Sequence, residues 1–289
     1  MGKKMRTLCL LLAMLLLLSG CKETAATPTA TAPTTQPTEP ATEPTEPAPI
    51  DNEEALRAAL EAGGRVLIEG DILLAKGVGG KGYMLDGGGY TITGPELQQE
   101  EVETEAGKEM QNIADTETAV LFSGGTIENM TIRGAYRCMG DGNGYSMTSD
   151  VRIKNVDAEG TLYALQTRKG NGNGSLYVEN CTLRGWVNIN KVKTAQFRDC
   201  TFGHTSEGKN GYFRCFQDST LIGCQFEPYV DENGKKTPYN ISFYSSTSGV
   251  TLVLEDCYVG DTLITEQNIK SLLKLTPRSN KIVVRNTAQ

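Results

Sequence analysis

Five short segments carry residues that could act side by side on a ligand. Their corresponding polar or aromatic positions are Arg137, Tyr163, Asn188, Arg214 and Ser242. Lys191 follows the third segment, and Gln166 and Gln217 end two of the others. Guanidinium and ammonium groups suit an acidic polysaccharide, and Tyr163 or Trp186 could stack on a sugar ring. An ordinary solvated sheet face would have the same composition, so that alternative stays open.

The sequence gives less support to a metal site or a catalytic histidine than to ligand binding by these segments. His204 is the only histidine and lies in a Gly-rich segment, so we expect a surface loop residue and not a sole catalyst. Residues 141–143 match a calcium loop weakly and fit a turn better. The cysteines and His204 lack the paired spacing of a zinc site, so no metal ligand is assigned.

A repeated phrase indicates the elements that would position these residues. It reads IENMTIRG at 127–134, IKNVDAEG at 153–160, VENCTLRG at 178–185, FRDCTFGH at 197–204, LIGCQFEP at 221–228, LEDCYVGD at 254–261 and a truncated VRNT at 284–287. Uneven spacing between copies favours a constant strand element with loops of varying length. The corner of each copy is Asn129, Asn155, Asn180, Asp199, Gly223, Asp256 or Asn286. These residue types tolerate positive φ, so the copies predict a stacked corner between two strands.

Further columns follow from the same alignment. The inward position after the corner holds Met130, Val156, Cys181, Cys200, Cys224 and Cys257, where cysteine acts as a small apolar residue. Parallel side chains favour free thiols in this column, although a secreted chain could oxidise them. Outward positions hold Glu128, Lys154, Glu179, Arg198, Ile222, Glu255 and Arg285 before the corner, and Arg133, Glu159 and Arg184 after it. Alternating charge predicts ion pairs between stacked strands.

The repeated phrase and its asparagine corner resemble the right-handed parallel β-helix of the pectin-lyase-like superfamily. The resemblance covers nearly all of residues 50–289 and implies an all-β solenoid of about eight or nine coils. Residues 51–64 predict a helix that begins after Asp51 or Asn52, exposes an apolar face at Leu56 and Leu60, and ends at Gly63. In that family such a helix caps the N-terminal end. Residues 265–275 predict a second, short covering helix.

The resemblance implies a saccharide cleft on the third strand of each coil. Family lyases use a basic residue, for which Arg137 or Arg214 is available, with Ca²⁺ held by clustered acids. No column of Asp or Glu lies beside the five polar or aromatic positions named above. The sequence therefore lacks the calcium ligands of such a lyase site. Family hydrolases use several aspartates with GHG and RIK motifs, whereas here RIK at 152–154 and GHT at 203–205 occur in the wrong order and place.

The N-terminal sequence predicts export. Lys3, Lys4 and Arg6 precede an apolar run, and LSGC follows at 18–21, which resembles a bacterial lipoprotein signal in residues 1–20 with Cys21 as the lipid attachment site. Residues 21–49 are rich in Thr, Pro and Glu, which predicts a disordered linker before the body at 50–289. Residues 96–118 form an acidic, helix-prone insertion. The formal net charge of −7 makes nucleic acid an improbable partner.

Together these observations predict a surface-anchored, extracytoplasmic lipoprotein that binds a carbohydrate or cell-envelope polymer, with no catalytic residue assigned. Arg137, Tyr163, Asn188, Lys191 and Arg214 are the expected binding residues. A polysaccharide lyase or glycoside hydrolase acting on an acidic polysaccharide is the first alternative, with Ca²⁺ as cofactor only in the lyase case. A structural surface module without a small ligand is the second.

Overall fold

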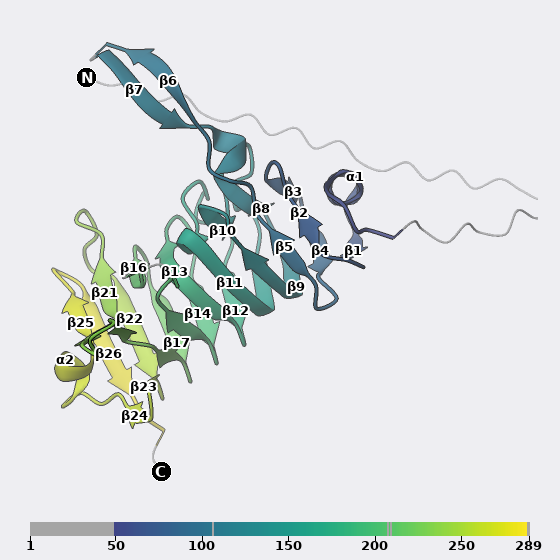
Figure 1. Ribbon diagram of the computed structural model, residues 1–289. Helices are drawn as coiled ribbons and strands as arrows, with labels where there is room; N and C mark the ends of the chain where they lie inside the picture. The colour runs from purple at the N-terminus through teal and green to yellow at the C-terminus, as the bar shows by residue number, and fades with distance from the viewer. Residues whose placement is uncertain (1–48, 106, 207, 209, 288–289) are drawn as a thin grey trace, which may run out of the picture. The chain divides into compact units, whose positions relative to one another are not determined.

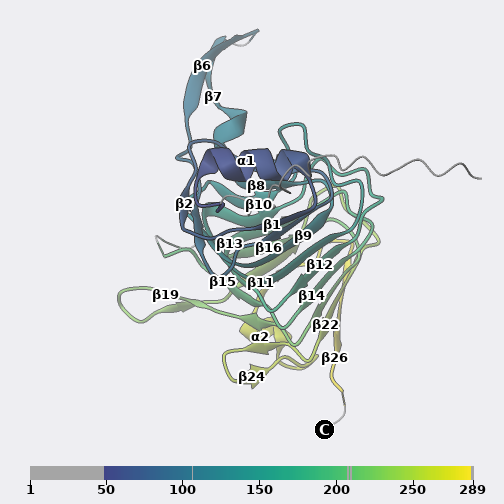
Figure 2. The same ribbon diagram turned by 90° about the vertical axis from the view of Figure 1, so that its right-hand side faces the viewer.

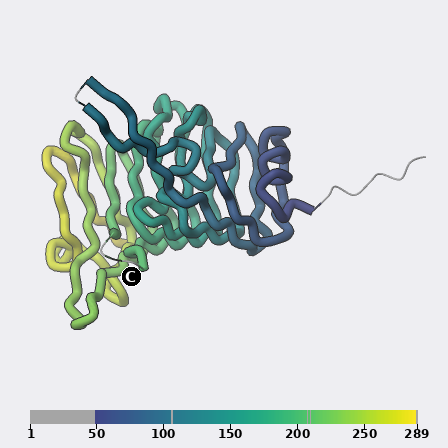
Figure 3. The backbone as a smooth tube through the Cα atoms, turned by 45° about the horizontal axis from the view of Figure 1, so that its top comes forward, coloured from purple at the N-terminus to yellow at the C-terminus, as the bar shows by residue number. Residues whose placement is uncertain are grey.

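The computed structural model describes residues 49–105, 107–206, 208 and 210–287. The predicted signal peptide, Cys21 and the predicted linker up to residue 48 lie outside these residues. The described body is all-β, and most of its strands belong to one 22-stranded sheet of mainly parallel pairs that is compatible with a β-solenoid (Figure 1). Figure 3 follows the backbone through its successive turns.

The parallel pairs fall into three stacks of strands. The first stack consists of β1 (Arg65–Leu67), β4 (Tyr83–Asp86), the first part of β9 (Gly125–Arg133), the first part of β11 (Val151–Gln166), β12 (Leu176–Glu179), β14 (Ala195–Arg198), β17 (Ser219–Ile222), β22 (Thr251–Glu255) and β26 (Lys281–Arg285). Figure 2 shows β9, β12, β14, β22 and β26 in succession on its right-hand side. The predicted charge column lies in this stack with the expected register, since Glu128, Lys154 and Glu179 are consecutive partners.

The second and third stacks continue from the first around each turn. The second contains β2 (Ile72–Leu73), β5 (Thr91–Thr93), parts of β9 and β11, β13 (Thr182–Ile189), β15 (Thr201–Gly203), β18 (Gln225–Phe226) and β23 (Tyr258–Val259). The third contains β3 (Val78–Gly80), β8 (Thr118–Phe122), β10 (Arg137–Gly140), the ends of β11 and β13, β16 (Tyr212–Cys215), β21 (Asn240–Phe243) and β25 (Lys274–Thr276).

The corner between the first and second stacks has the predicted backbone. Positive φ values between 49° and 61° occur at Asn129, Asn155, Asn180, Asp199, Gly223 and Asp256. The Asn180 amide donates to Asn155 Oδ1 at 2.8 Å, and Asn155 donates to Asn129 Oδ1 at 2.8 Å. Asn286 does not continue this ladder, because its amide donates to the Ile264 carbonyl oxygen at 3.2 Å.

The core consists of inward residues from all three stacks. Its aromatic part holds Phe197, Phe202, Phe213, Phe226 and Tyr239, with ring centroids 5.3 to 6.4 Å apart. The six cysteines of the body are all buried and free, and four of them lie in the predicted inward column: Cys181, Cys200, Cys224 and Cys257. Water therefore does not reach these thiols in the folded protein.

We expect these thiols to resist alkylation in the folded protein. All six thiols are at most 2% exposed, so the reagent cannot reach them in the folded protein. Burial also raises the pKa of the Cys215 thiol to about 11 and that of Cys138 further, whereas the Cys224 side chain lowers the pKa of Cys257, whose protection is therefore steric. Iodoacetamide at pH 8 should leave all six body cysteines of the folded protein unmodified, and it should modify all six in urea. Mass spectrometry of the intact protein counts the modified cysteines in each case. Rapid labelling without urea would contradict the packing described here.

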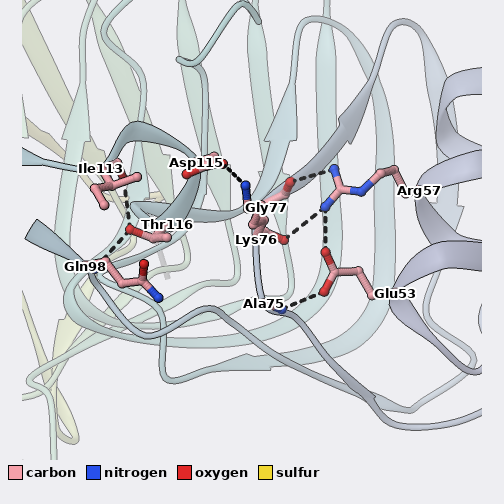
Figure 4. Close-up of polar contacts among 9 residues, drawn as sticks. All are labelled: Glu53, Arg57, Ala75, Lys76, Gly77, Gln98, Ile113, Asp115 and Thr116. Carbon is pink, nitrogen blue, oxygen red and sulfur yellow. Dashed lines mark hydrogen bonds and ion pairs between the residues drawn. The ribbon is translucent and has the colours of Figure 1, made fainter.

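The N-terminal helix forms where the sequence predicts it. α1 (Glu53–Ala62) begins after Asn52, whose side chain accepts from the Ala55 N–H, and ends at Gly63 with φ 77°. Leu56 and Leu60 are fully buried in the core. Arg57 donates to the Gly77 carbonyl oxygen at 3.1 Å, and Glu53 accepts from the Ala75 N–H at 2.6 Å, which fixes α1 to the segment before β3 (Figure 4).

The acidic insertion is a β-hairpin and not a helix. β6 (Gln99–Thr104) and β7 (Gly107–Asn112) pair antiparallel and form a separate two-stranded sheet, followed by the 3₁₀ helix η1 (Ala114–Thr116) (Figure 1). Gly107 has φ 121°, a conformation that ends helical propagation and suits a tight turn. The Glu-rich composition predicts helix, but the turn at Gly107 and the cross-strand pairs favour the hairpin.

The C-terminal part contains the remaining elements. α2 (Ile269–Leu272) forms within the predicted segment and buries Ile269. β24 (Thr262–Leu263) pairs with β23, and a second small hairpin joins β19 (Tyr229–Val230) and β20 (Lys236–Thr237). No helix in the described part of the chain is long and apolar enough to cross a bilayer.

Candidate functional site

The outward face of the third stack carries two adjacent columns instead of the predicted one. The first column holds Arg137, Tyr163, Trp186, Tyr212, Asn240 and Lys274. The second holds Gly140, Gln166, Asn188, Arg214, Ser242 and Thr276. The pairing of β11 with β13 shifts register between Tyr163 and Leu165. This irregularity moves Asn188, Arg214 and Ser242 out of the column that starts at Arg137 and Tyr163, so the predicted alignment was wrong there.

An aromatic row runs along the first column. It consists of Tyr136, Tyr163, Trp186 and Tyr212, all of them half-buried. Successive ring centroids lie 5.7, 5.4 and 5.3 Å apart, with edge-on or tilted planes. Such contacts hold each ring in place, because aromatic pairs prefer edge-to-face packing. The sequence indicated Tyr163 and Trp186, whereas Tyr136 and Tyr212 join the row only through the observed register.

Arg214 lies beside the aromatic row as an unpaired cation. Its guanidinium carbon is 4.9 Å from the Tyr212 ring centroid and 5.6 Å from those of Trp186 and Tyr244. Neither Arg214 nor Lys274 forms an ion pair with another described residue. The guanidinium therefore keeps most of its donors for a ligand while the rings fix its plane.

A hollow of about 330 Å³ opens where the two columns meet. We call it the Trp186 pocket, and its lining includes Trp186, His204, Asn210, Gly211, Tyr212, Arg214, Thr237, Pro238, Asn240 and Lys274. None of these residues is acidic. Hollows of similar volume lie elsewhere, such as one of about 350 Å³ beside Arg133 and Glu159, but that one has no aromatic wall. The Trp186 pocket, by contrast, combines aromatic side chains with the cationic Arg214 and Lys274.

Several polar atoms around this face are buried without a partner in the protein. They are Arg214 Nε and Asn240 Oδ1 in the pocket, and Gln166 Oε1 and Asn188 Oδ1 along the second column. Buried polar groups in native proteins are nearly always hydrogen-bonded. These four atoms are shielded from solvent as well as unpartnered within the described residues.

Arg137 is not a free binding residue. Its side chain is only 3% exposed, and its guanidinium donates to Thr118 Oγ1 at 2.9 Å and to Glu117 Oε2 at 3.2 Å. Arg168 bonds the same Glu117 oxygen at 2.8 Å. Glu117 belongs to the end of the insertion, so the sequence pattern gave no signal that it would cover Arg137. Arg137 therefore has almost no exposed surface with which it could contact a ligand.

The other predicted binding residues occupy different parts of the face. Tyr163 belongs to the aromatic row, and Asn188 is 8% exposed beside Arg214. Lys191 is exposed in the turn after β13, with φ 54°, and its carbonyl oxygen accepts from the Gly172 N–H at 3.0 Å. Ser242 is buried against the Tyr212 hydroxyl. The structure thus groups Arg214 with Trp186 and Tyr212, while Lys191 lies outside the pocket lining.

The isolated acid and the single histidine have structural contacts. Asp141 is buried and accepts from the backbone N–H groups of Arg168 at 2.5 Å and Lys169 at 2.7 Å, so it fixes a turn. His204 lies in the loop after β15 as predicted, but it is half-buried and not fully at the surface, because its ring lies 5.5 Å from the rings of both Tyr229 and Tyr239. No group of three or more His, Cys, Asp or Glu that could hold a metal occurs within the described ranges.

Comparisons of the chain with protein-family models, with curated proteins and with solved structures gave no significant match. The functional argument therefore rests on the geometry of the Trp186 pocket and on the sequence.

Proposed function

We propose that this protein is a lipid-anchored β-helix exposed at the bacterial surface. The three parallel stacks, the ladder of positive-φ corners and the burial of α1 through Leu56 and Leu60 support a right-handed parallel β-helix capped by α1, similar to the pectin-lyase-like superfamily. The signal pattern in residues 1–20, with lipid attachment at Cys21, and the linker at 21–49 support extracytoplasmic anchoring to the membrane.

The proposed activity of the body is to bind a carbohydrate or cell-envelope glycan without cleaving it. The observation that carries this proposal is the Trp186 pocket, where an aromatic row meets Arg214 and Lys274 with no acidic lining residue. Sugar rings present flat C–H faces to aromatic rings and hydroxyls to polar side chains, and the pocket lining offers both kinds of residue. Successive strands repeat at about 4.8 Å, which is comparable with one sugar unit of an extended polymer.

The charge of the pocket favours an acidic glycan. Arg214 can pair with a carboxylate through two parallel N–H donors, and Lys274 adds a second cation on the same side. Tyr163, Asn188 and Lys191 extend the proposed contact surface beyond the pocket. The chain as a whole is acidic, so a local cationic pocket would draw the polymer to this face alone.

Removing the Arg214 guanidinium should weaken binding selectively. We expect Arg214→Ala to raise the Kd for an acidic polysaccharide about tenfold, since a hydrogen bond to a charged group is worth roughly 1.5 kcal/mol. The Kd for any neutral polysaccharide should change little. Isothermal titration calorimetry measures both values, and Arg198→Ala, an exposed arginine of the first stack, is the matched control. Equal losses in both variants would contradict the assignment.

A polysaccharide lyase or glycoside hydrolase remains the alternative that Arg214 itself favours, since an unpaired cation in a pocket can also assist proton removal. Incubation with polysaccharides, with and without Ca²⁺, distinguishes the two. New reducing ends or unsaturated uronate absorbance that disappear in Arg214→Ala would replace binding by catalysis as the function. Absence of both binding and products would favour a structural surface module.

A further inference from the structure

Glu159 lies between two arginines in the second stack but forms an ion pair with neither. Arg133 and Arg184 are its partners on the neighbouring strands. Both arginines form ion pairs with Asp157 instead. Arg133 Nη2 lies 2.5 Å from Asp157 Oδ2, and Arg184 Nη1 lies 3.1 Å from Asp157 Oδ1. The alternating ion pairs expected from the sequence are therefore absent at Glu159, and its carboxylate is available for another contact.

That contact is to a segment far along the chain. Glu159 Oε1 accepts from the backbone N–H of Ser206 at 2.6 Å, across 47 residues of sequence. Partial burial alone would raise the pKa of Glu159, but hydrogen bonding from Ser206 and the charges of Arg133 and Arg184 hold it below the usual range. The carboxylate is thus ionised and fixed at neutral pH.

The segment held by Glu159 separates two hollows. Thr205 and Ser206 line the hollow beside Arg133 and Glu159, whereas His204 lines the Trp186 pocket. Ser206 ties this segment to the second stack through its bond to Glu159, and the neighbouring Thr205 is 5% exposed. Gly211 packs so closely on the His204 ring that an added Cβ would lie 2.6 Å from Nδ1.

We propose that Glu159 is a positioning residue of the Trp186 pocket. Its carboxylate holds residues 204–206 against the second stack, and this places the His204 ring as a wall of the pocket. The inference rests on the proposed glycan-binding function only where affinity is concerned, because the shape of the pocket can be measured without any ligand.

The sole tryptophan of the chain makes that measurement possible. Trp186 lines the same pocket as His204, so acrylamide quenching of its fluorescence reports how well the wall shields the indole. We expect Glu159→Ala to raise the quenching constant about twofold through local opening. Glu159→Gln, which keeps one acceptor for the Ser206 N–H, should give an intermediate value. Glu179→Ala, an exposed glutamate of the first stack, is the matched control and should resemble the unchanged protein.

Affinity provides a second and independent readout. If charge alone mattered, Glu159→Ala would lower the Kd for an acidic polysaccharide, because it removes a negative charge that repels the polymer. Loss of the wall should instead raise the Kd about tenfold in Glu159→Ala, with partial recovery in Glu159→Gln. Increased quenching together with weaker binding supports the proposal.

Two other outcomes separate the failure of this proposal from that of the function. Increased quenching in a protein that binds no polysaccharide would support the positioning role and reject glycan binding. Quenching in Glu159→Ala equal to that of the unchanged protein, at an unchanged melting temperature, would overturn the positioning role whatever the protein binds.

Discussion

Glu117→Gln is expected to destabilise the folded protein by about 3 kcal/mol, because removing one partner of a buried ion pair leaves the other charge uncompensated. Arg137, 3% exposed, would face a neutral amide in place of its carboxylate, and Arg168 would lose the same negative charge. The melting temperature should fall by about 5–10 °C for a body of this size. Urea unfolding followed by circular dichroism measures the loss directly.

An exposed ion pair in the same protein gives the control for this substitution. Glu101 bonds Lys108 at 2.6 Å on the hairpin, with both side chains more than half exposed. Glu101→Gln should therefore cost less than about 0.5 kcal/mol, as is usual for surface pairs. Equal effects of the two substitutions would mean that the cluster around Glu117 is not buried as described.

The Glu117 effect should also depend on pH. Burial alone would raise the pKa of this carboxyl, but the Asn112 amide and the charges of Arg137 and Arg168 lower it below the usual value. A lowered folded-state pKa contributes stability above the unfolded value, and this stability is lost as the pH falls through the folded value. The difference in stability between the unchanged protein and Glu117→Gln should thus shrink below about pH 4.

Asn180→Val is expected to destabilise the protein by about 2–4 kcal/mol. Asn180 has φ 51°, a conformation that a β-branched residue adopts only at a cost of roughly 1–3 kcal/mol. Its bond to Asn155 at 2.8 Å is also lost, which adds about 1 kcal/mol. Thermal unfolding monitored by circular dichroism measures the change.

Glycine at the same position separates these two contributions. Asn180→Gly keeps the positive φ without strain and loses only the side-chain bond, so we expect a cost of about 1 kcal/mol. An unchanged melting temperature in Asn180→Val would mean that the corner at Asn180 does not have the described conformation.

The corner ladder was predictable because each copy of the repeated phrase meets the same local constraint. Positive φ restricts residue type at every turn, so Asn129, Asn155 and Asn180 identified the corner without knowledge of any contact. The inward cysteines followed from the same register. Asn286 departs from the ladder because its amide finds the Ile264 carbonyl oxygen, a contact that the phrase does not encode.

The candidate site was less predictable because it depends on contacts between distant segments. One register shift in β11 separates Tyr163 from Asn188 and Arg214, and a repeat alignment cannot detect it. Arg137 reads as an exposed cation until Glu117 covers it from the insertion. Glu159 likewise reads as a partner of Arg133 and Arg184, although both prefer Asp157. In each case several partners are available to the side chain, and which of them it contacts depends on the folded structure.

The most direct test of the central claim is a titration of the purified protein with acidic and neutral polysaccharides, followed by Trp186 fluorescence. Trp186 is the only tryptophan of the chain and lines the pocket, so any spectral change reports this site. The account predicts a saturable change with an acidic polymer that is lost in Arg214→Ala and kept in Arg198→Ala. No change with any polymer, in protein that melts normally, would contradict glycan binding at this pocket.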